Sequence, residues 1–239
     1  MHVNALQNCL LLGLAISQFQ PALTQETPPS QCATGVHAIL MRGQGPGDHL
    51  NVMVSVQNLV LQLIPGSSSV ALPYSHGADD HRVAASNGTY MMQDYIRSYV
   101  ASCPDSKIFI IGYSLGGVAM MDGLCGTSSQ WLFKVPAIEP HFNQNVIAAV
   151  SYGEETYVPG LSYDHGTCTD GTGIYPRIHP EWCDPFLSSI RSYCDEGDGS
   201  CCFRFLPPIT DPAHFLYIFR YNMEVIQFVQ QRLKATQSQ

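Results

Sequence analysis

The sequence carries little positive charge. Lysine and arginine together number 11 of 239 residues, aspartate and glutamate number 19, and the formal net charge is -8. A chain of this kind is poorly suited to neutralising phosphates, so we expect neither nucleic acid nor stable membrane association. The sequence also lacks internal repeats and low-complexity tracts, and its 45% hydrophobic content is enough for one domain with a substantial core.

The N-terminus lacks a basic segment, but it contains a short apolar core. Residues 9–16 read Cys-Leu-Leu-Leu-Gly-Leu-Ala-Ile, a run too short to span a bilayer, and small and polar residues follow. This pattern is typical of a secretory signal peptide, which we place at residues 1–24. We therefore predict a secreted, extracellular protein with one domain at residues 32–236.

No pair of Cys-x-x-Cys knuckles is present, and the eight cysteines that follow the predicted signal peptide are widely scattered. Zinc sites usually need closely spaced ligands, so we expect neither a metal nor another cofactor. An even number of cysteines in a secreted protein instead predicts disulfides, but spacing alone does not give their connectivity. The secreted context also makes Asn87, in the sequon Asn-Gly-Thr, a candidate glycosylation site.

Apolar runs and helical periodicities alternate along the chain. The segments predicted as strands are 36–41, 70–74, 108–111, 147–152 and 190–194. The segments predicted as helices are 50–63, 90–101, 118–124 and a last helix that begins at His214. This alternation favours an α/β domain with a largely parallel sheet.

Two further expectations concern the loops and the last helix. Residues 75–86, which contain His76, Asp79, Asp80 and His81, are interpreted as a solvated loop rather than a metal site. Residues 153–189 are predicted to be mostly loop and to shape the substrate site. The apolar residues that recur at helical spacing in the last helix are assigned to the core; they are Phe215, Ile218, Phe219, Ile226, Val229 and Leu233.

The segment around Ser114 carries the strongest functional signal. Residues 108–111 form the continuous apolar run of a strand buried on both faces, and Gly112-Tyr-Ser-Leu-Gly116 follows directly. This fits the G-x-S-x-G turn, in which a strand passes sharply into a helix and leaves the serine exposed as a nucleophile. A phosphate-binding loop is the main alternative, and it is disfavoured because no Lys-Ser or Lys-Thr pair follows the glycines.

A nucleophilic serine needs a histidine base within hydrogen-bond reach and a carboxylate that orients this base. In α/β-hydrolases the chain order is serine, acid, histidine. Of the histidines that follow Ser114, only His214 comes after a late acidic loop and directly before the C-terminal helix, which makes it the predicted base. The other histidines after the serine are His141, His165 and His179.

Three carboxylates compete for the role of the acid in the short segment between Cys194 and Cys201. They are Asp195, Glu196 and Asp198. Glycines on both sides give Asp198 the freest choice of backbone conformation, which favours it. An exposed acidic turn without function remains the alternative interpretation of this segment.

Several separated motifs together resemble one known family. They are Gly112-Tyr-Ser-Leu-Gly-Gly117, Gly160-Leu-Ser-Tyr163 with Gly166-Thr-Cys168, and Ser192-Tyr-Cys-Asp-Glu-Gly-Asp198 with Cys201-Cys202. In this order they look like the cutinase and acetylxylan esterase family, over roughly residues 32–234. The resemblance implies a secreted serine esterase that needs no metal. Its implied fold is a three-layer α/β/α sandwich with a five-stranded, mainly parallel α/β-hydrolase sheet and no large lid.

The resemblance also implies roles for individual residues. Ser114 would be the nucleophile, Asp198 the acid and His214 the base. The number and positions of the cysteines resemble the acetylxylan esterase branch. By that resemblance the disulfides would be Cys32–Cys103, Cys125–Cys183, Cys168–Cys202 and Cys194–Cys201.

The chain departs from the family pattern at the oxyanion hole, the set of donors that binds the negative oxygen of the tetrahedral intermediate. Leu115 stands where the family usually has glutamine, but only its backbone N–H is required. The second donor usually comes from a serine or threonine after the first strand, and residues 43–48 contain neither. Backbone N–H groups at residues 45–48, with Gly47 as the candidate, could replace it. Losing one donor can cost about 3 kcal/mol in transition-state stabilisation.

The predicted activity is hydrolysis of carboxylic esters by a monomer, with acetylated plant polysaccharide as the expected substrate. Cutin-like polyester is the alternative substrate. A secreted binding protein that has lost turnover is a second alternative, because the oxyanion hydroxyl is missing. A purely structural, disulfide-stapled protein would leave the Ser114 turn and the late His214 unexplained.

Overall fold

The computed structural model describes residues 31–45, 51–74, 80–204 and 212–237. Within this part of the chain, six strands form one sheet in the order β2-β1-β3-β4-β6-β5, and every neighbouring pair is parallel. The strands are β1 (Val36–Met41), β2 (Ser68–Ala71), β3 (Lys107–Tyr113), β4 (Val146–Tyr152), β5 (Asp164–His165) and β6 (Ile190–Tyr193). The predicted signal peptide and Gly47 lie outside the described residues.

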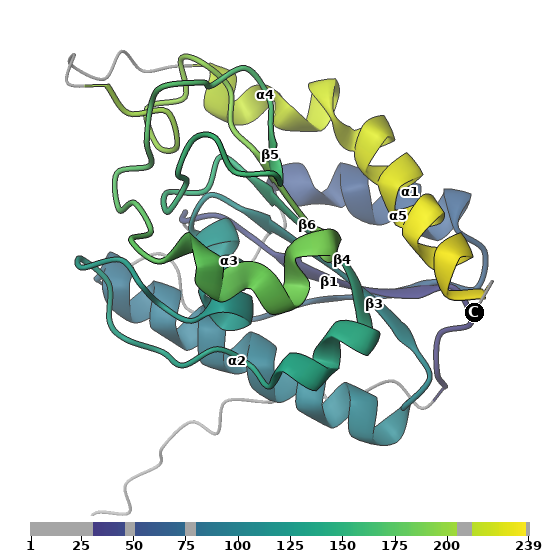
Figure 1. Cartoon of the computed structure of the whole chain (residues 1–239). Coiled ribbons are helices and arrows are strands. Elements are labelled where there is room, and N and C mark those ends of the chain that lie inside the picture. The colour runs from purple at the N-terminus through teal and green to yellow at the C-terminus, as the bar shows by residue number, and fades with distance from the viewer. Residues whose placement is uncertain (1–30, 46–50, 75–79, 205–211, 238–239) are drawn as a thin grey trace, which may run out of the picture.

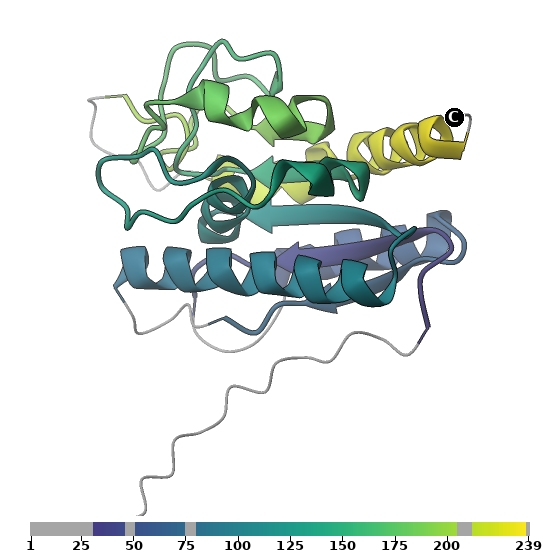
Figure 2. The ribbon, with the colours of Figure 1, turned by 60° about the horizontal axis from the view of Figure 1, so that its bottom comes forward.

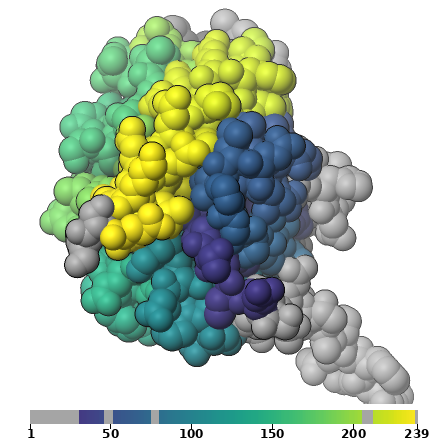
Figure 3. Space-filling model, turned by 90° about the vertical axis from the view of Figure 1, so that its right-hand side faces the viewer, coloured from purple at the N-terminus to yellow at the C-terminus, as the bar shows by residue number. Residues whose placement is uncertain are grey.

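Helices cover both faces of this sheet (Figures 1 and 2). The α-helices are α1 (Val54–Leu63), α2 (His81–Ser102), α3 (Leu115–Cys125), α4 (Ala213–Arg220) and α5 (Asn222–Gln237). The described residues also form three 3-10 helices: η1 (Asn51–Met53), η2 (Pro140–Gln144) and η3 (Pro180–Ser189). Figure 3 shows α5, in yellow, lying beside α1, in blue, although the two are far apart in the sequence.

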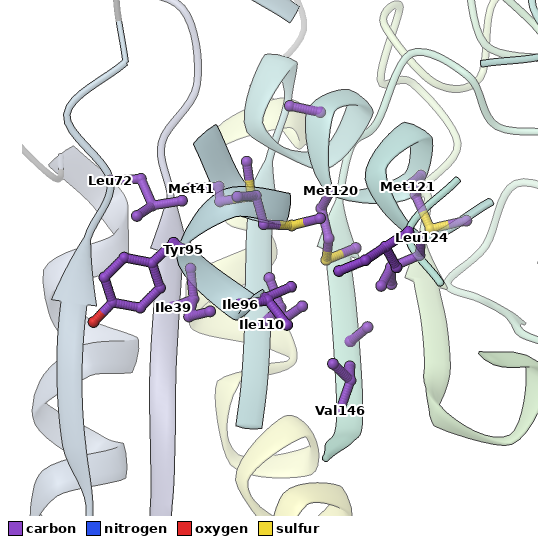
Figure 4. Packing of buried hydrophobic residues seen from close by; sticks show 14 of the residues in the cluster. Ile39, Met41, Leu72, Tyr95, Ile96, Ile110, Met120, Met121, Leu124 and Val146 are labelled. Atoms are coloured by element: carbon purple, nitrogen blue, oxygen red, sulfur yellow. The ribbon is translucent and has the colours of Figure 1, made fainter. Parts of the chain in front are cut away.

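Two apolar clusters fill the spaces on either side of the sheet. One cluster joins β1 and β3 to α2 and α3, and Figure 4 shows its packing around Ile39, Ile96, Ile110 and Met120. The other joins the opposite face of the strands to α1 and α5. The central strands alternate their side chains between two covered faces, which is why β3 reads as a continuous apolar run. The predicted three-layer α/β/α sandwich is confirmed.

The number of strands differs from the prediction of five. The sixth strand, β5, has two residues and lies in the segment predicted to be mostly loop. A strand this short has no apolar run, so its pattern cannot be recognised in the sequence. The interpretation of residues 75–86 as a loop is also wrong in part, because α2 already begins at His81.

The apolar stripe predicted for the last helix is wrong in part. The helix divides into α4 and α5 at Tyr221. Ile218 of α4 and Leu233 of α5 are partly buried and pack against the core as predicted. Ile226 and Val229 are buried in α5 as predicted, whereas Phe215 and Phe219 of α4 are 60% and 80% exposed. Spacing of three or four places residues on one helical face but does not determine whether anything covers that face.

In the described part of the chain, no helix combines the length and the apolar composition that a membrane crossing requires.

Candidate active site

Ser114 lies in the sharp turn between β3 and α3. It is the only non-glycine residue with a positive φ among the described residues, at φ 53° and ψ -122°. The packing around the turn leaves no room for side chains on its glycines. A Cβ built on Gly112 would lie 2.4 Å from the Gly116 carbonyl oxygen, and one on Gly116 would lie 2.0 Å from that of Met41. The surrounding fold therefore holds the serine in a conformation that costs roughly 1–3 kcal/mol.

Asp198 and His214 form a hydrogen-bonded pair. The Nδ1 atom of His214 lies 2.8 Å from Oδ2 and 3.0 Å from Oδ1 of Asp198, whose side chain is fully buried. Two further groups donate to this carboxylate: the Tyr217 hydroxyl to Oδ2 at 2.7 Å and the Ser200 backbone N–H to Oδ1 at 2.9 Å. This arrangement fixes the imidazole ring and directs its Nε2 atom away from the carboxylate.

The imidazole lies next to the Ser114 turn through its contact with Tyr113. The Tyr113 and His214 ring centroids are 4.9 Å apart, and Tyr113 directly precedes the serine. Burial, together with the nearby Asp198 charge, raises the pKa of Tyr113. Between the described atoms of Ser114 and His214 there is no direct hydrogen bond. Bonds of this kind are often long without substrate and tighten in the reacting complex.

Two neighbouring disulfides hold the loop that carries Asp198. Cys194–Cys201 closes the loop across seven residues, and Cys168–Cys202 ties its end to the segment after β5. The sulfur atoms of Cys168, Cys194 and Cys202 lie within 4.8 Å of one another. These sulfurs are bonded in pairs, so they are not thiolate ligands for a metal.

The structure contains the same four disulfides that the family resemblance implies. The remaining two lie outside the acid loop and are Cys32–Cys103 and Cys125–Cys183.

The other carboxylates of the acid loop bond elsewhere. Asp195 is buried and accepts from Arg220 at 2.6 Å and from the Tyr221 hydroxyl at 2.6 Å. Glu196 is exposed and pairs with Arg204 at 2.9 Å. Asp198 is thus the one acid of the three that faces His214.

The other three histidines are also engaged away from Ser114. His165 stacks on Tyr193, His179 stacks on Trp182, and His141 contacts Phe142. None of these partners belongs to the turn that carries the serine.

Gly153 follows β4 and lies directly against the acid–base pair. A Cβ at this position would lie 2.6 Å from Asp198 Oδ2 and 2.9 Å from His214 Nδ1, and its φ is 59°. The sequence patterns single out neither Gly153 nor Tyr217 as part of the site. The bond from Tyr217 to Asp198 spans 19 residues and leaves no local sequence signal.

The loop after β1 approaches Ser114 from the other side. A Cβ on Gly43 would lie 3.2 Å from the Ser114 Cβ atom. Leu115 is the first residue of α3, and the first N–H groups of a helix have no partner within the helix. Its N–H is therefore available to a negative oxygen beside Ser114, and the helix dipole favours such a charge.

Comparison with known proteins gives the family. A family model described as Cutinase matches residues 32–233. The chain belongs to the cutinase family. Among relatives, an acetylxylan esterase of Hypocrea jecorina is 28% identical and the alignment covers 96% of this chain and 78% of the relative. Acetylxylan esterase 2 of Talaromyces purpureogenus is 30% identical, with 75% of this chain and 78% of the relative covered.

The fold agrees with this assignment. A solved acetylxylan esterase structure matches this cutinase-family chain with a TM-score of 0.76 at 27% identity, covering 85% of this chain and 100% of that one. Membership of the cutinase family and likeness to these esterases make the chain a carboxylesterase of the serine hydrolase type.

Proposed function

We propose that this carboxylesterase works through an acyl-enzyme with Ser114 as nucleophile, His214 as base and Asp198 as the acid that orients the base. The observation that carries the proposal is the buried Asp198 carboxylate bonded to His214 Nδ1 at 2.8 Å, beside the strained Ser114 turn. With Nδ1 bonded to the carboxylate, Nε2 is the ring atom that can accept the serine proton.

In the first step the Ser114 oxygen forms a bond to the ester carbonyl carbon, the carbonyl electron pair moves to its oxygen, and the serine proton passes to His214. Collapse of this intermediate breaks the bond to the alcohol, which receives the proton from His214. Water then attacks the acyl-enzyme with the same proton transfers and releases the acid. Asp198 stabilises the imidazolium that forms in each half-reaction.

Acetyl esters on plant polysaccharide are the proposed substrates, and the protein is proposed to act outside the cell as a monomer. The relatives named above are acetylxylan esterases, and four disulfides suit an oxidising compartment. Longer acyl esters or polyesters are the second candidate. Exposed Phe215 and Phe219 follow His214 on α4 and offer an apolar surface near the site.

Ser114→Ala should abolish turnover of p-nitrophenyl acetate and labelling by a fluorophosphonate probe, with an unchanged melting temperature. Ser188→Ala, at an exposed position, is the control and should behave as the wild type. Wild-type turnover by Ser114→Ala would refute the proposed nucleophile. In the same assay, rates that fall from acetyl to butyryl and longer esters favour the polysaccharide esterase, and rising rates favour the polyester hydrolase.

A further inference from the structure

Three side chains from separate elements meet beside the start of α2. His81, the first residue of α2, lies with Nδ1 3.1 Å from Oε1 of Gln44, which belongs to the loop after β1. Its Nε2 atom lies 2.5 Å from Oε2 of Glu155. The Tyr175 ring packs on the imidazole, with centroids 5.3 Å apart. We refer to Gln44, His81 and Glu155 as the relay.

The backbone next to Gln44 packs against the nucleophilic Ser114. Gly43 directly precedes Gln44. Its Cα lies so close to Tyr113 and Ser114 that a side chain would not fit there. The residue before it, Arg42, is buried, and its guanidinium donates to the Tyr74 carbonyl oxygen at 2.8 Å. The backbone that carries Gln44 is therefore held at the edge of the Ser114 turn.

The contacts of His81 determine which way the Gln44 amide faces. The amide oxygen Oε1 of Gln44 lies at His81 Nδ1, and an amide oxygen can only accept, so Nδ1 is the donor in this bond. His81 therefore binds the oxygen end of the Gln44 amide. The amide N–H groups then point away from His81 and are left for another acceptor.

The reaction needs such a donor. An oxyanion hole uses two or more donors aimed at the developing charge, and the Leu115 N–H supplies one. We infer that the Gln44 side-chain amide supplies another, so that Gln44 is a catalytic residue, while His81 and Glu155 are positioning residues that orient it. This inference rests on the proposed acyl-enzyme chemistry at Ser114 and deepens it. The Gln44 side-chain amide thus replaces the backbone N–H groups near Gly47 as the candidate for the second oxyanion donor.

The inference is tested with the full chain and p-nitrophenyl acetate. Gln44→Leu keeps the approximate size of the side chain and removes both amide donors. It should lower kcat about 100-fold or more, with KM and the melting temperature close to wild type. Gln44→Glu, which places oxygen where the amide nitrogen was, should lose at least as much.

The positioning role of His81 predicts a graded result. His81→Phe should lower kcat, and His81→Asn, which can place an amide donor near the position of Nδ1, should restore part of the loss. Adding His81→Phe to Gln44→Leu should cause little further loss, because the donor that it orients is already absent. Fully additive losses in the double variant would remove His81 and Glu155 from the inference.

Gln62→Leu, at an exposed position of α1, is the matched control and should keep wild-type kcat. Gln44→Leu with kcat within about twofold of wild type would overturn the inference, since a lost oxyanion donor costs far more. A loss explained by a fall in melting temperature would overturn it as well. These failures differ from failure of the proposed function, in which Ser114→Ala itself would retain turnover.

Discussion

The two sides of the candidate site are built in different ways. On the acid–base side, Asp198 is fully buried, lies in a loop closed by a disulfide, and receives hydrogen bonds from three residues. On the oxyanion side, Gln44 is exposed, and among the described residues its side chain bonds only to His81. The first side resists the loss of single contacts, whereas the second depends on few of them.

A short segment after β4 joins the two sides. Gly153 lies against the Asp198–His214 pair, and Glu155 pairs with His81 of the relay. Between them, Glu154 is fully buried and packs its Cβ against the start of α3, where a Cβ on Gly117 would come within 2.7 Å. Changes in these three consecutive residues should therefore affect different halves of the site.

Gly153→Ala should produce the largest effect. The new Cβ would overlap the hydrogen bond between Asp198 and His214, and the positive φ of 59° adds backbone strain. Displacing the imidazole by about 1 Å can reduce the rate about 100-fold, so kcat for p-nitrophenyl acetate should fall by that order.

Gly160→Ala is the matched control for backbone strain. Gly160 has a φ of 89°, but a Cβ there would meet no atom of the described residues within 4 Å. This variant should lose stability and keep kcat. Equal loss of kcat in both variants would show that strain, and not contact with the acid–base pair, causes the effect.

The buried carboxyl group of Glu154 should make the stability of the protein depend on pH. Burial raises the pKa of Glu154 to about 7, and the Arg177 charge and hydrogen bonds from Thr156 oppose this shift only in part. Because the folded pKa lies above the unfolded value, the stabilisation is complete below about pH 4.5 and is lost as pH rises towards 7. A shift of this size corresponds to about 3 kcal/mol in the free energy of unfolding.

Urea unfolding of the wild type and of Glu154→Gln between pH 4.5 and 7 measures this contribution. The variant has no group to ionise at this position, so its stability relative to wild type should rise across the window. Glu196→Gln, at an exposed position, is the control and should follow the wild type. A constant difference between wild type and Glu154→Gln would contradict the raised pKa.

The two sides also differ in how far the sequence could predict them. The Ser114 turn is local: an apolar run, two glycines and a helix follow one another, and so its geometry could be predicted from the pattern. Glycine on both sides favoured Asp198, which is the acid that faces His214. The relay could not be predicted, because Gln44 and Glu155 lie 37 and 74 positions from His81 and no local pattern connects them.

The sequence pattern also gave wrong predictions where the burial of a residue depends on which other element packs against it. Phe215, Phe219 and Ile226 share helical spacing, yet α4 exposes its two phenylalanines and α5 buries the isoleucine. The same limit applies to β5, which forms because its backbone pairs with β6 and not because its two residues are apolar. Tertiary contacts of this kind are invisible to periodicity.

Tyr217→Phe should produce the smallest effect and tests whether the acid–base side is over-determined. The Tyr217 hydroxyl donates to Asp198 and accepts from the Asp195 N–H at 2.9 Å, so its removal leaves a buried donor unpaired and should cost about 1–3 kcal/mol in the free energy of unfolding. Asp198 keeps its bonds to His214 and Ser200, and kcat should fall by no more than about tenfold. Tyr221→Phe is the control. It removes a hydrogen bond to Asp195 and none to Asp198, so it should leave kcat unchanged. A loss in Tyr217→Phe as large as that in Gln44→Leu would mean that both sides of the site depend equally on single contacts.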